Sequence, residues 1–227
     1  MLVTLHVWRV PRRKIGAAFL RMARDPRRLR SLPGVTFAKL LGTSAGNTFV
    51  PGEADWTRYA AVVAWDGPPV DVDGGWARIA ESSARVDLTP LHSRGTWSGR
   101  VPFGVPAGGK TDGPVLALTR ARLRPAKALT FWNAVPPVSK ELHAADGLLA
   151  RFGVGEAPIG WQGTVSVWRS TADLVAFAYR QPQHRAVIAR TPTDNWYAED
   201  LFARFAIREI SGDRTVLGWR EGGQARQ

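Results

Sequence analysis

The sequence contains no cysteine among its 227 residues, and this absence removes a whole set of chemistries. Disulfide bonds, zinc sites with cysteine ligands, iron–sulfur clusters, thiolate-ligated haem and cysteine nucleophiles are all excluded. A chain without disulfides is compatible with a reducing compartment, and we expect a cytoplasmic protein. With four histidines in the chain, any transition-metal or haem site must use histidine, carboxylate or tyrosine.

Long apolar runs and the common catalytic signatures are also missing. No stretch approaches the roughly 18 uninterrupted apolar residues of a membrane span. The N-terminus places its apolar residues before its charges, which is the reverse of a secretory signal. We therefore expect a soluble protein, with contact to a membrane surface left open. The patterns GxGxxG after a strand, GxxxxGK before Ser or Thr, HExxH and GxSxG are absent, which excludes the usual nucleotide, zinc-protease and esterase signatures.

Acidic residues are scarce, above all near the N-terminus. The chain carries 31 Lys and Arg against 19 Asp and Glu, a net charge of +12. Residues 1–30 hold nine basic residues and Asp25 alone, which gives this segment +8. An anionic membrane surface or a nucleic acid would suit such a patch. Since no nucleic-acid-binding motif accompanies it, we do not expect a nucleic-acid partner, and a solvated arginine-rich helix face is the simpler interpretation.

What the chain does contain is the composition of a globular protein, with 44% hydrophobic and 22% charged residues and an unusual ten tryptophans. In the first half, alternation predicts a strand over Leu2–Val10, and helical spacing predicts a helix from Lys14 that Pro26 should end or kink. Further elements are expected as strands at 35–41, 59–65 and 87–97 and a weak helix at 75–84. The second half predicts strands at 115–122, 149–154, 164–168 and 205–210, a helix at 126–135, and a helix capped by Ser170 to Asp173 that Pro182 interrupts.

Both halves thus follow the order strand, helix, strand, strand, helix, strand, which is ferredoxin-like. We predict an α+β protein in which two ferredoxin-like repeats, residues 1–100 and 114–212, close their sheets into an α+β barrel. A Gly- and Pro-rich linker at 101–113 should join them. The polar tail at 213–227 should contribute little to the core.

Among the histidines, His184 stands apart. His6 lies on a strand with the pattern of a hydrogen-bonded core histidine, while His92 and His143 have polar surroundings and are expected at the surface. Helical spacing places His184 on the apolar side of its helix. From the residues alone, a buried hydrogen-bonded histidine and a metal ligand are both open for His184.

The segment from 195 to 205 is the densest cluster of aromatic and charged residues in the chain. One interpretation is a helical turn that leads into the last strand, with Trp196 and Phe202 packed inward.

Several blocks of the chain together resemble the spheroidene monooxygenase family of haem-dependent carotenoid oxygenases. The blocks are Phe37–Thr43, Phe49–Pro51, Phe131–Pro136, Gly155–Pro158, Val165–Ser170, His184 and Trp196–Phe205. They span most of the chain, and the second half is the more specific. The block WYAEDLFARF, placed after a helix that contains a histidine, is the strongest motif.

The resemblance implies a dimeric α+β barrel fold, a b-type haem, O₂ and an apolar substrate such as a carotenoid, with an electron donor such as a ferredoxin. It makes His184 the candidate ligand of the haem iron, and Glu199 or Asp200 could accept a hydrogen bond from its far ring nitrogen. The candidate partners of the haem propionates are Arg180, Arg185 and Arg190. Several tryptophans are expected to line an internal cavity, from the set Trp8, Trp132, Trp161, Trp168 and Trp196. Of these, Trp168 and Trp196 are the candidate cofactor contacts.

Other functions stay open at this stage. A haem enzyme of secondary metabolism could bind a nitrogen-containing substrate and carry out N-oxidation or dehydration. A haem carrier without catalysis, or a binding module without a cofactor, could share the fold. The resemblance leaves the oligomeric state undetermined.

Overall fold

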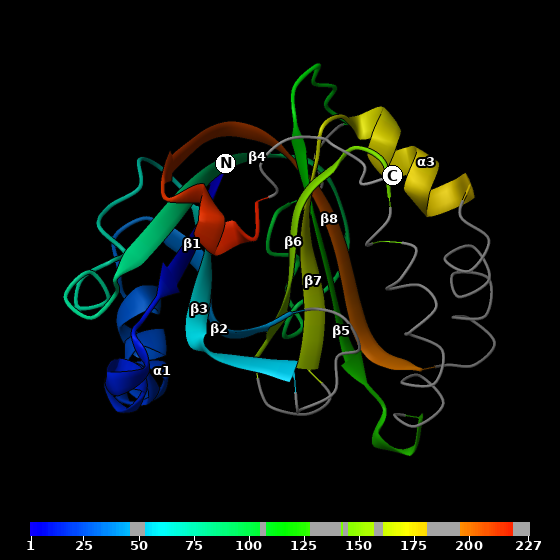
Figure 1. The fold of residues 1–227 in the computed structure, drawn as a ribbon. Helices are drawn as coiled ribbons and strands as arrows, with labels where there is room; N and C mark the ends of the chain where they lie inside the picture. The colour runs from blue at the N-terminus through cyan, green and yellow to red at the C-terminus, as the bar shows by residue number, and fades with distance from the viewer. Residues whose placement is uncertain are drawn as a thin grey trace, which may run out of the picture.

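The fold is a closed barrel of eight antiparallel strands with helices on its outside (Figure 1). The computed structural model describes residues 1–45, 53–104, 108–127, 142, 145–156, 161–180 and 196–219. The strands are β1 (Leu2–Arg9), β2 (Val35–Ser44), β3 (Ala54–Trp65), β4 (Ser82–Gly95), β5 (Val115–Leu123), β6 (Leu148–Gly155), β7 (Trp161–Trp168) and β8 (Tyr197–Gly212). The expected α+β class and barrel closure are confirmed.

Each half of the chain contributes one contiguous half of the barrel. The order around the barrel is β1-β3-β2-β6-β7-β5-β8-β4, so the first half supplies β4-β1-β3-β2 and the second supplies β8-β5-β7-β6. Two seams join them: a long one between β4 and β8 and a short one between β2 and β6. Because both seams are hydrogen-bonded ladders, the two halves share one interior core.

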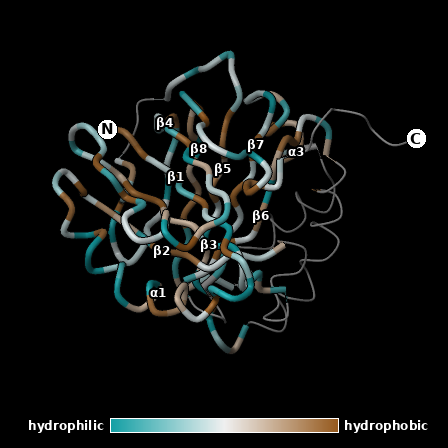
Figure 2. The backbone as a smooth tube through the Cα atoms, turned by 60° about the vertical axis from the view of Figure 1, so that its left-hand side comes forward, coloured by the Kyte–Doolittle hydropathy of each residue, from teal (hydrophilic) through white to brown (hydrophobic). Residues whose placement is uncertain are grey.

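Two α-helices, α1 (Ile15–Arg30) and α3 (Thr171–Arg180), lie on opposite sides of the barrel (Figures 1 and 2). The 3₁₀ helices are η1 (Arg12–Lys14), η3 (Pro125–Lys127) and η4 (Arg214–Leu217). In the part of the chain that is described, no helix is long and apolar enough to cross a membrane.

Strand alternation divides the core into three clusters. One fills the barrel interior with residues such as Val62, Leu118 and Phe205. A second lies between the first-half sheet and α1, and a third lies between the second-half sheet and α3. The outward side of each half-sheet is therefore the side on which a helix packs.

Two expectations for the first half need correction. Helix α1 does not end at Pro26 but continues to Arg30, since Ala18 and Leu29, buried on either side of the proline, hold both parts against the sheet. The alternative, a kink at Pro26, stays a prediction. The weak helix at 75–84 does not form. Turns replace it, because Gly74 takes a left-handed φ of 47° and β4 already begins at Ser82.

The C-terminal region also differs from its expectation. The segment from Tyr197 onward is strand β8 and not a helical turn, because its backbone pairs with β5 on one side and β4 on the other. The tail is not wholly peripheral: Val216 and Leu217 of η4 are buried within the barrel interior cluster. The predicted helix at 126–135 falls almost entirely outside the described residues, and the part of the predicted helix around His184 lies outside them as well.

Candidate functional site

The outward side of the second-half sheet carries small side chains at its centre. One row runs across four strands, with Gly153 paired to Thr164, Thr164 to Thr119 and Thr119 to Phe202. Thr119 is exposed although β5 is a central strand. We call this surface the small-residue face; it consists of Ala117, Thr119, Ala121, Gly153 and Thr164. Because these side chains are small, they project little from the sheet, and the outward surface here is flat.

Helix α3 and its aromatic neighbours border this face. Leu174 and Phe177 of α3 pack with Ala117 and Trp168 in the third core cluster. The Trp168 ring lies 5.2 Å from that of Phe177, and its Nε1 donates to Ser166 Oγ at 3.0 Å. Trp168 is fully buried, so the face is closed by an aromatic wall at this end.

The start of α3 is held as its sequence predicts. Ser170 Oγ accepts a hydrogen bond from the Asp173 backbone N–H at 3.1 Å and donates to Asp173 Oδ2 at 2.8 Å. Arg169 adds an ion pair to Asp173 at 3.0 Å. The cap satisfies a terminal N–H and fixes where the helix leaves β7.

Two buried donors on this side of the sheet lack a partner among the described residues. They are Nε of Arg204 and Nε2 of Gln162. Arg204 pairs in register with Ala117, and Gln162 with Ala121, so both side chains flank the small-residue face. A buried donor without an acceptor costs about 1–3 kcal/mol, which points to an acceptor at this edge. Sequence reasoning missed Arg204 because it placed 195–205 in a helical turn.

The structure describes only some of the residues that are predicted to bind haem. His184, Arg185, Arg190 and Trp132 lie outside the described residues, as does His143. Arg180 is the last residue of α3, and neither its side chain nor that of Trp161 is described. Trp196 is fully buried directly before β8, where its carbonyl accepts from Arg124 N at 2.9 Å. Trp168 lies on the same side of the sheet as α3.

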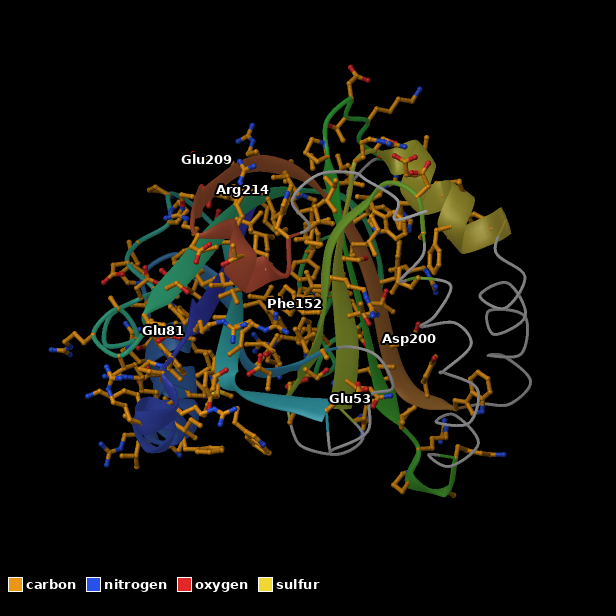
Figure 3. All side chains as sticks on the ribbon, in the orientation of Figure 1. Glu53, Glu81, Phe152, Asp200, Glu209 and Arg214 are labelled. Atoms are coloured by element: carbon orange, nitrogen blue, oxygen red, sulfur yellow. The ribbon has the colours of Figure 1, made fainter. Side chains whose placement is uncertain are left out.

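Glu199 and Asp200 point to opposite sides of β8. Glu199 turns into the barrel, where it accepts hydrogen bonds from the Arg120 guanidinium, from Gly99 N at 2.8 Å and from Thr96 Oγ1 at 3.1 Å. These contacts engage the Glu199 carboxylate on the side of β8 away from α3, and its expected hydrogen bond to His184, which lies outside the described residues, stays a prediction. Asp200 faces outward and is labelled beside β8 in Figure 3.

Around Glu199 lies an interior ion cluster, which consists of Lys39, Arg120, Glu156 and Glu199. Lys39 Nζ is 2.5 Å from Glu156 Oε2, and Arg120 Nη2 is 3.1 Å from Glu156 Oε1. Trp97 Nε1 also donates to Glu156 at 2.5 Å, and the Arg120 guanidinium lies 5.6 Å from the Trp97 ring centre. Three blocks of the family resemblance therefore meet in one structural cluster inside the barrel.

The charge state of Glu199 follows from these contacts. Burial raises the pKa of this carboxyl, but hydrogen bonds from Gly99 N–H and Arg120 outweigh burial and lower the pKa to about 2. Glu199 is therefore ionised at neutral pH. Inside the barrel, its charge is balanced by the Arg120 guanidinium.

In the first half, aromatic rings fill the space between the sheet and α1. Trp8 stacks on Trp76 at 4.9 Å and on His6 at 5.8 Å, and its Nε1 donates to Asp73 Oδ1 at 2.8 Å. Of the five tryptophans considered for the cavity, Trp8 therefore packs in the core. His6 is 3% exposed and shares a hydrogen bond with Thr4 Oγ1, as a core histidine should. His92 is exposed as expected.

Comparisons with known proteins show to which family the chain belongs. No protein-family model matches the chain. Spheroidene monooxygenase from Rhodobacter capsulatus is 35% identical over 82% of this chain and 81% of its own length. The protein of that name from Rubrivivax gelatinosus is 34% identical over 79% of this chain and 72% of its own length. An aldoxime dehydratase crystal structure covers 91% of this chain and 80% of its own, with a TM-score of 0.58 at 12% identity, a similarity of fold alone. On the strength of the two curated relatives, the chain belongs to the spheroidene monooxygenase family and is an oxidoreductase of the monooxygenase class.

Proposed function

We propose that the protein is a haem-dependent monooxygenase that binds its haem on the small-residue face and oxidises an apolar substrate such as a carotenoid. The observation that carries the proposal is the pairing of a flat face of small side chains with the buried, unpartnered Nε of Arg204 at its edge. A b-type haem is a flat apolar ring with two carboxylates, so it needs both features.

Different residues of this chain would bind the iron, the propionates and the ring of the haem. His184, four positions beyond the end of α3, would ligate the iron, and Asp200 could orient the histidine ring. Arg204 joins the arginines expected to pair with the propionates, which are Arg180, Arg185 and Arg190. Trp168 would wall the ring at the α3 end, and Trp196 is the second candidate aromatic contact. Bound haem would supply the activation of O₂, while the apolar wall excludes water from the reacting atoms.

The substrate assignment is supported by the relatives. The two reported proteins carry the name spheroidene monooxygenase, which supports a carotenoid or similarly long apolar substrate, O₂ and an external electron donor such as a ferredoxin. The orders β4-β1-β3-β2 and β8-β5-β7-β6 support two ferredoxin-like repeats in a dimeric α+β barrel. A cytoplasmic location stays a prediction.

A second candidate rests on the fold similarity to aldoxime dehydratase. In that case the same face would hold haem for dehydration or N-oxidation of a small nitrogen-containing substrate. Dehydration of an aldoxime consumes neither O₂ nor reductant, whereas carotenoid oxidation and N-oxidation consume both. Dehydration is therefore separated from carotenoid oxidation by its O₂ dependence, and N-oxidation by its product.

The cofactor is tested by absorption spectroscopy of protein reconstituted with haem. Wild type should show a Soret band, and His184→Ala should lose it or shift it to that of loosely bound haem while circular dichroism stays native. His92→Ala is the matched control and should keep the wild-type spectrum, since His92 is exposed. An unchanged spectrum in His184→Ala would remove His184 as the ligand.

The reaction is tested with isotopically labelled O₂. The reconstituted enzyme with a ferredoxin reducing system should place labelled oxygen in a carotenoid product. Conversion of an aldoxime without O₂, with no carotenoid oxidation, would favour the second candidate instead.

A further inference from the structure

The solvent side of α1 exposes large apolar side chains. Phe19 is 47% and Leu20 58% exposed, and Trp56 of β3 beside them is 50% exposed. The rings of Phe19 and Trp56 lie 5.5 Å apart, so these two residues share one surface, and Leu20 follows Phe19 on the exposed side of α1. Exposed apolar side chains gathered in one patch and bordered by polar groups mark a site of interaction.

Basic side chains surround this patch. The exposed cations of the segment are Arg12, Arg13, Lys14, Arg24, Arg27 and Arg30. Arg24 and Arg27 follow Leu20 by four and seven residues, so they share its stripe of the helix. We call this surface the α1 face; it consists of Phe19, Leu20, Trp56 and the six exposed cations.

The other charges of the segment turn away from the α1 face. Arg28 Nη2 donates to the Val72 carbonyl at 2.6 Å, and Arg21 lies 3.5 Å from Asp25. Asp25, the one acid in residues 1–30, is buried. The exposed side of α1 is therefore purely cationic and apolar.

We infer that the α1 face docks the protein on an anionic lipid surface. Phe, Leu and Trp side chains enter the headgroup region, while arginines pair with lipid phosphates, and both contributions are present here. This inference goes beyond the proposed function and does not depend on it, because α1 lies on the opposite side of the barrel from α3 (Figure 1).

The chemistry of the face favours lipid over other partners. A second copy bound through the same patch would bring two sets of like charges together. A nucleic acid would meet the cations, but Leu20, the most exposed of the three apolar residues, would gain no stacking or hydrogen bond from it. A bilayer interface accommodates both the cations and the apolar side chains.

The charge contribution is tested by flotation of the full-length protein with vesicles. The protein should bind vesicles of equal parts phosphatidylcholine and phosphatidylglycerol, bind pure phosphatidylcholine weakly, and lose affinity as salt rises. Arg24→Glu should weaken binding about 5- to 30-fold, since each basic residue near the surface contributes about 1 kcal/mol. Arg208→Glu makes the same charge change on exposed β8 and should bind as wild type.

The apolar contribution is tested by Phe19→Ser with Leu20→Ser, which should reduce binding even at low salt. Val101→Ser, at another exposed apolar residue, is the control. With brominated phosphatidylglycerol, quenching of tryptophan fluorescence should disappear in Trp56→Phe while binding persists. The inference is overturned if Arg24→Glu and the double variant Phe19→Ser with Leu20→Ser bind vesicles as wild type does, if duplex DNA outcompetes vesicles for the face, or if Leu20→Ser instead dissociates a dimer.

Discussion

The two halves of the barrel share a strand order but use the outward side of their sheets differently. In the first half, Trp8, Trp65, Trp76 and Tyr59 fill the space under α1. In the second half, the corresponding central positions are occupied by glycine, alanine and threonine. The first half-sheet is thus covered at its centre by its own aromatic side chains, whereas the second packs against α3 near Trp168 and carries small side chains at its centre.

Under the proposed function, this difference would let one fold combine stability with a cofactor site. Aromatic packing in the first half and the interior ion cluster stabilise the barrel without any bound group. The second half can then leave its central positions small, because the shared interior core already holds its strands. Changes in the first half should therefore alter stability, and changes on the small-residue face should alter haem binding.

The largest effect on stability is expected at Trp8. Trp8→Ala removes a fully buried ring that stacks on two neighbours, and it should lower the free energy of unfolding by about 3–5 kcal/mol in urea denaturation. Trp56→Ala, at a half-exposed ring, should cost less than about 1 kcal/mol. Equal costs for the two variants would contradict the filled-core description of the first half.

A somewhat smaller effect is expected at Glu199, where the two halves meet. Its folded pKa of about 2 lies below the ordinary 4.5, so its stabilisation is complete above 4.5 and is lost as pH falls toward 2. Because solvent partly screens this group, we expect a contribution of about 1–2 kcal/mol. Glu199→Gln should lower stability at neutral pH and flatten the acid limb of an unfolding curve, whereas Glu209→Gln, at an exposed site, should leave that limb unchanged.

The smallest effect on stability is expected at Arg204. Arg204→Met removes a buried Nε without a described partner, so the free energy of unfolding should change by no more than about 1 kcal/mol. Haem affinity should nevertheless fall about 10-fold or more, because a charge-assisted hydrogen bond is lost. Arg208→Met is the exposed control, and equal haem affinity in both variants would remove Arg204 from the site.

Much of the fold follows from local pattern. Alternation identified β1, β5 and β7, and Ser170 with Asp173 marked the start of α3, because these signals depend on near neighbours. The turn at Gly74 and the path of β8 could not be derived in the same way. Both depend on pairing with strands distant in the sequence, which overrides the local preference of residues 75–84 and 195–205.

The site was less accessible from sequence. Glu199 and Arg204 belong to one motif, yet they lie on opposite sides of β8 and serve different purposes. A period of two, counted from Phe205, would have separated them, but the helical interpretation concealed it. No sequence pattern marks Thr119 as part of the site. It matters because it is a small residue at the centre of a sheet, where a large side chain would fill the space.

Haem titration followed by Soret absorption, with paired tryptophan insertions, tests the central claim most directly. Thr119→Trp fills the small-residue face, whereas Ala77→Trp adds the same ring at an exposed position in the first half. Wild type and Ala77→Trp should bind haem with the same spectrum, and Thr119→Trp should fail to bind it while its circular dichroism remains native. Haem binding by Thr119→Trp with unchanged affinity and spectrum would contradict the assignment of the cofactor to this face.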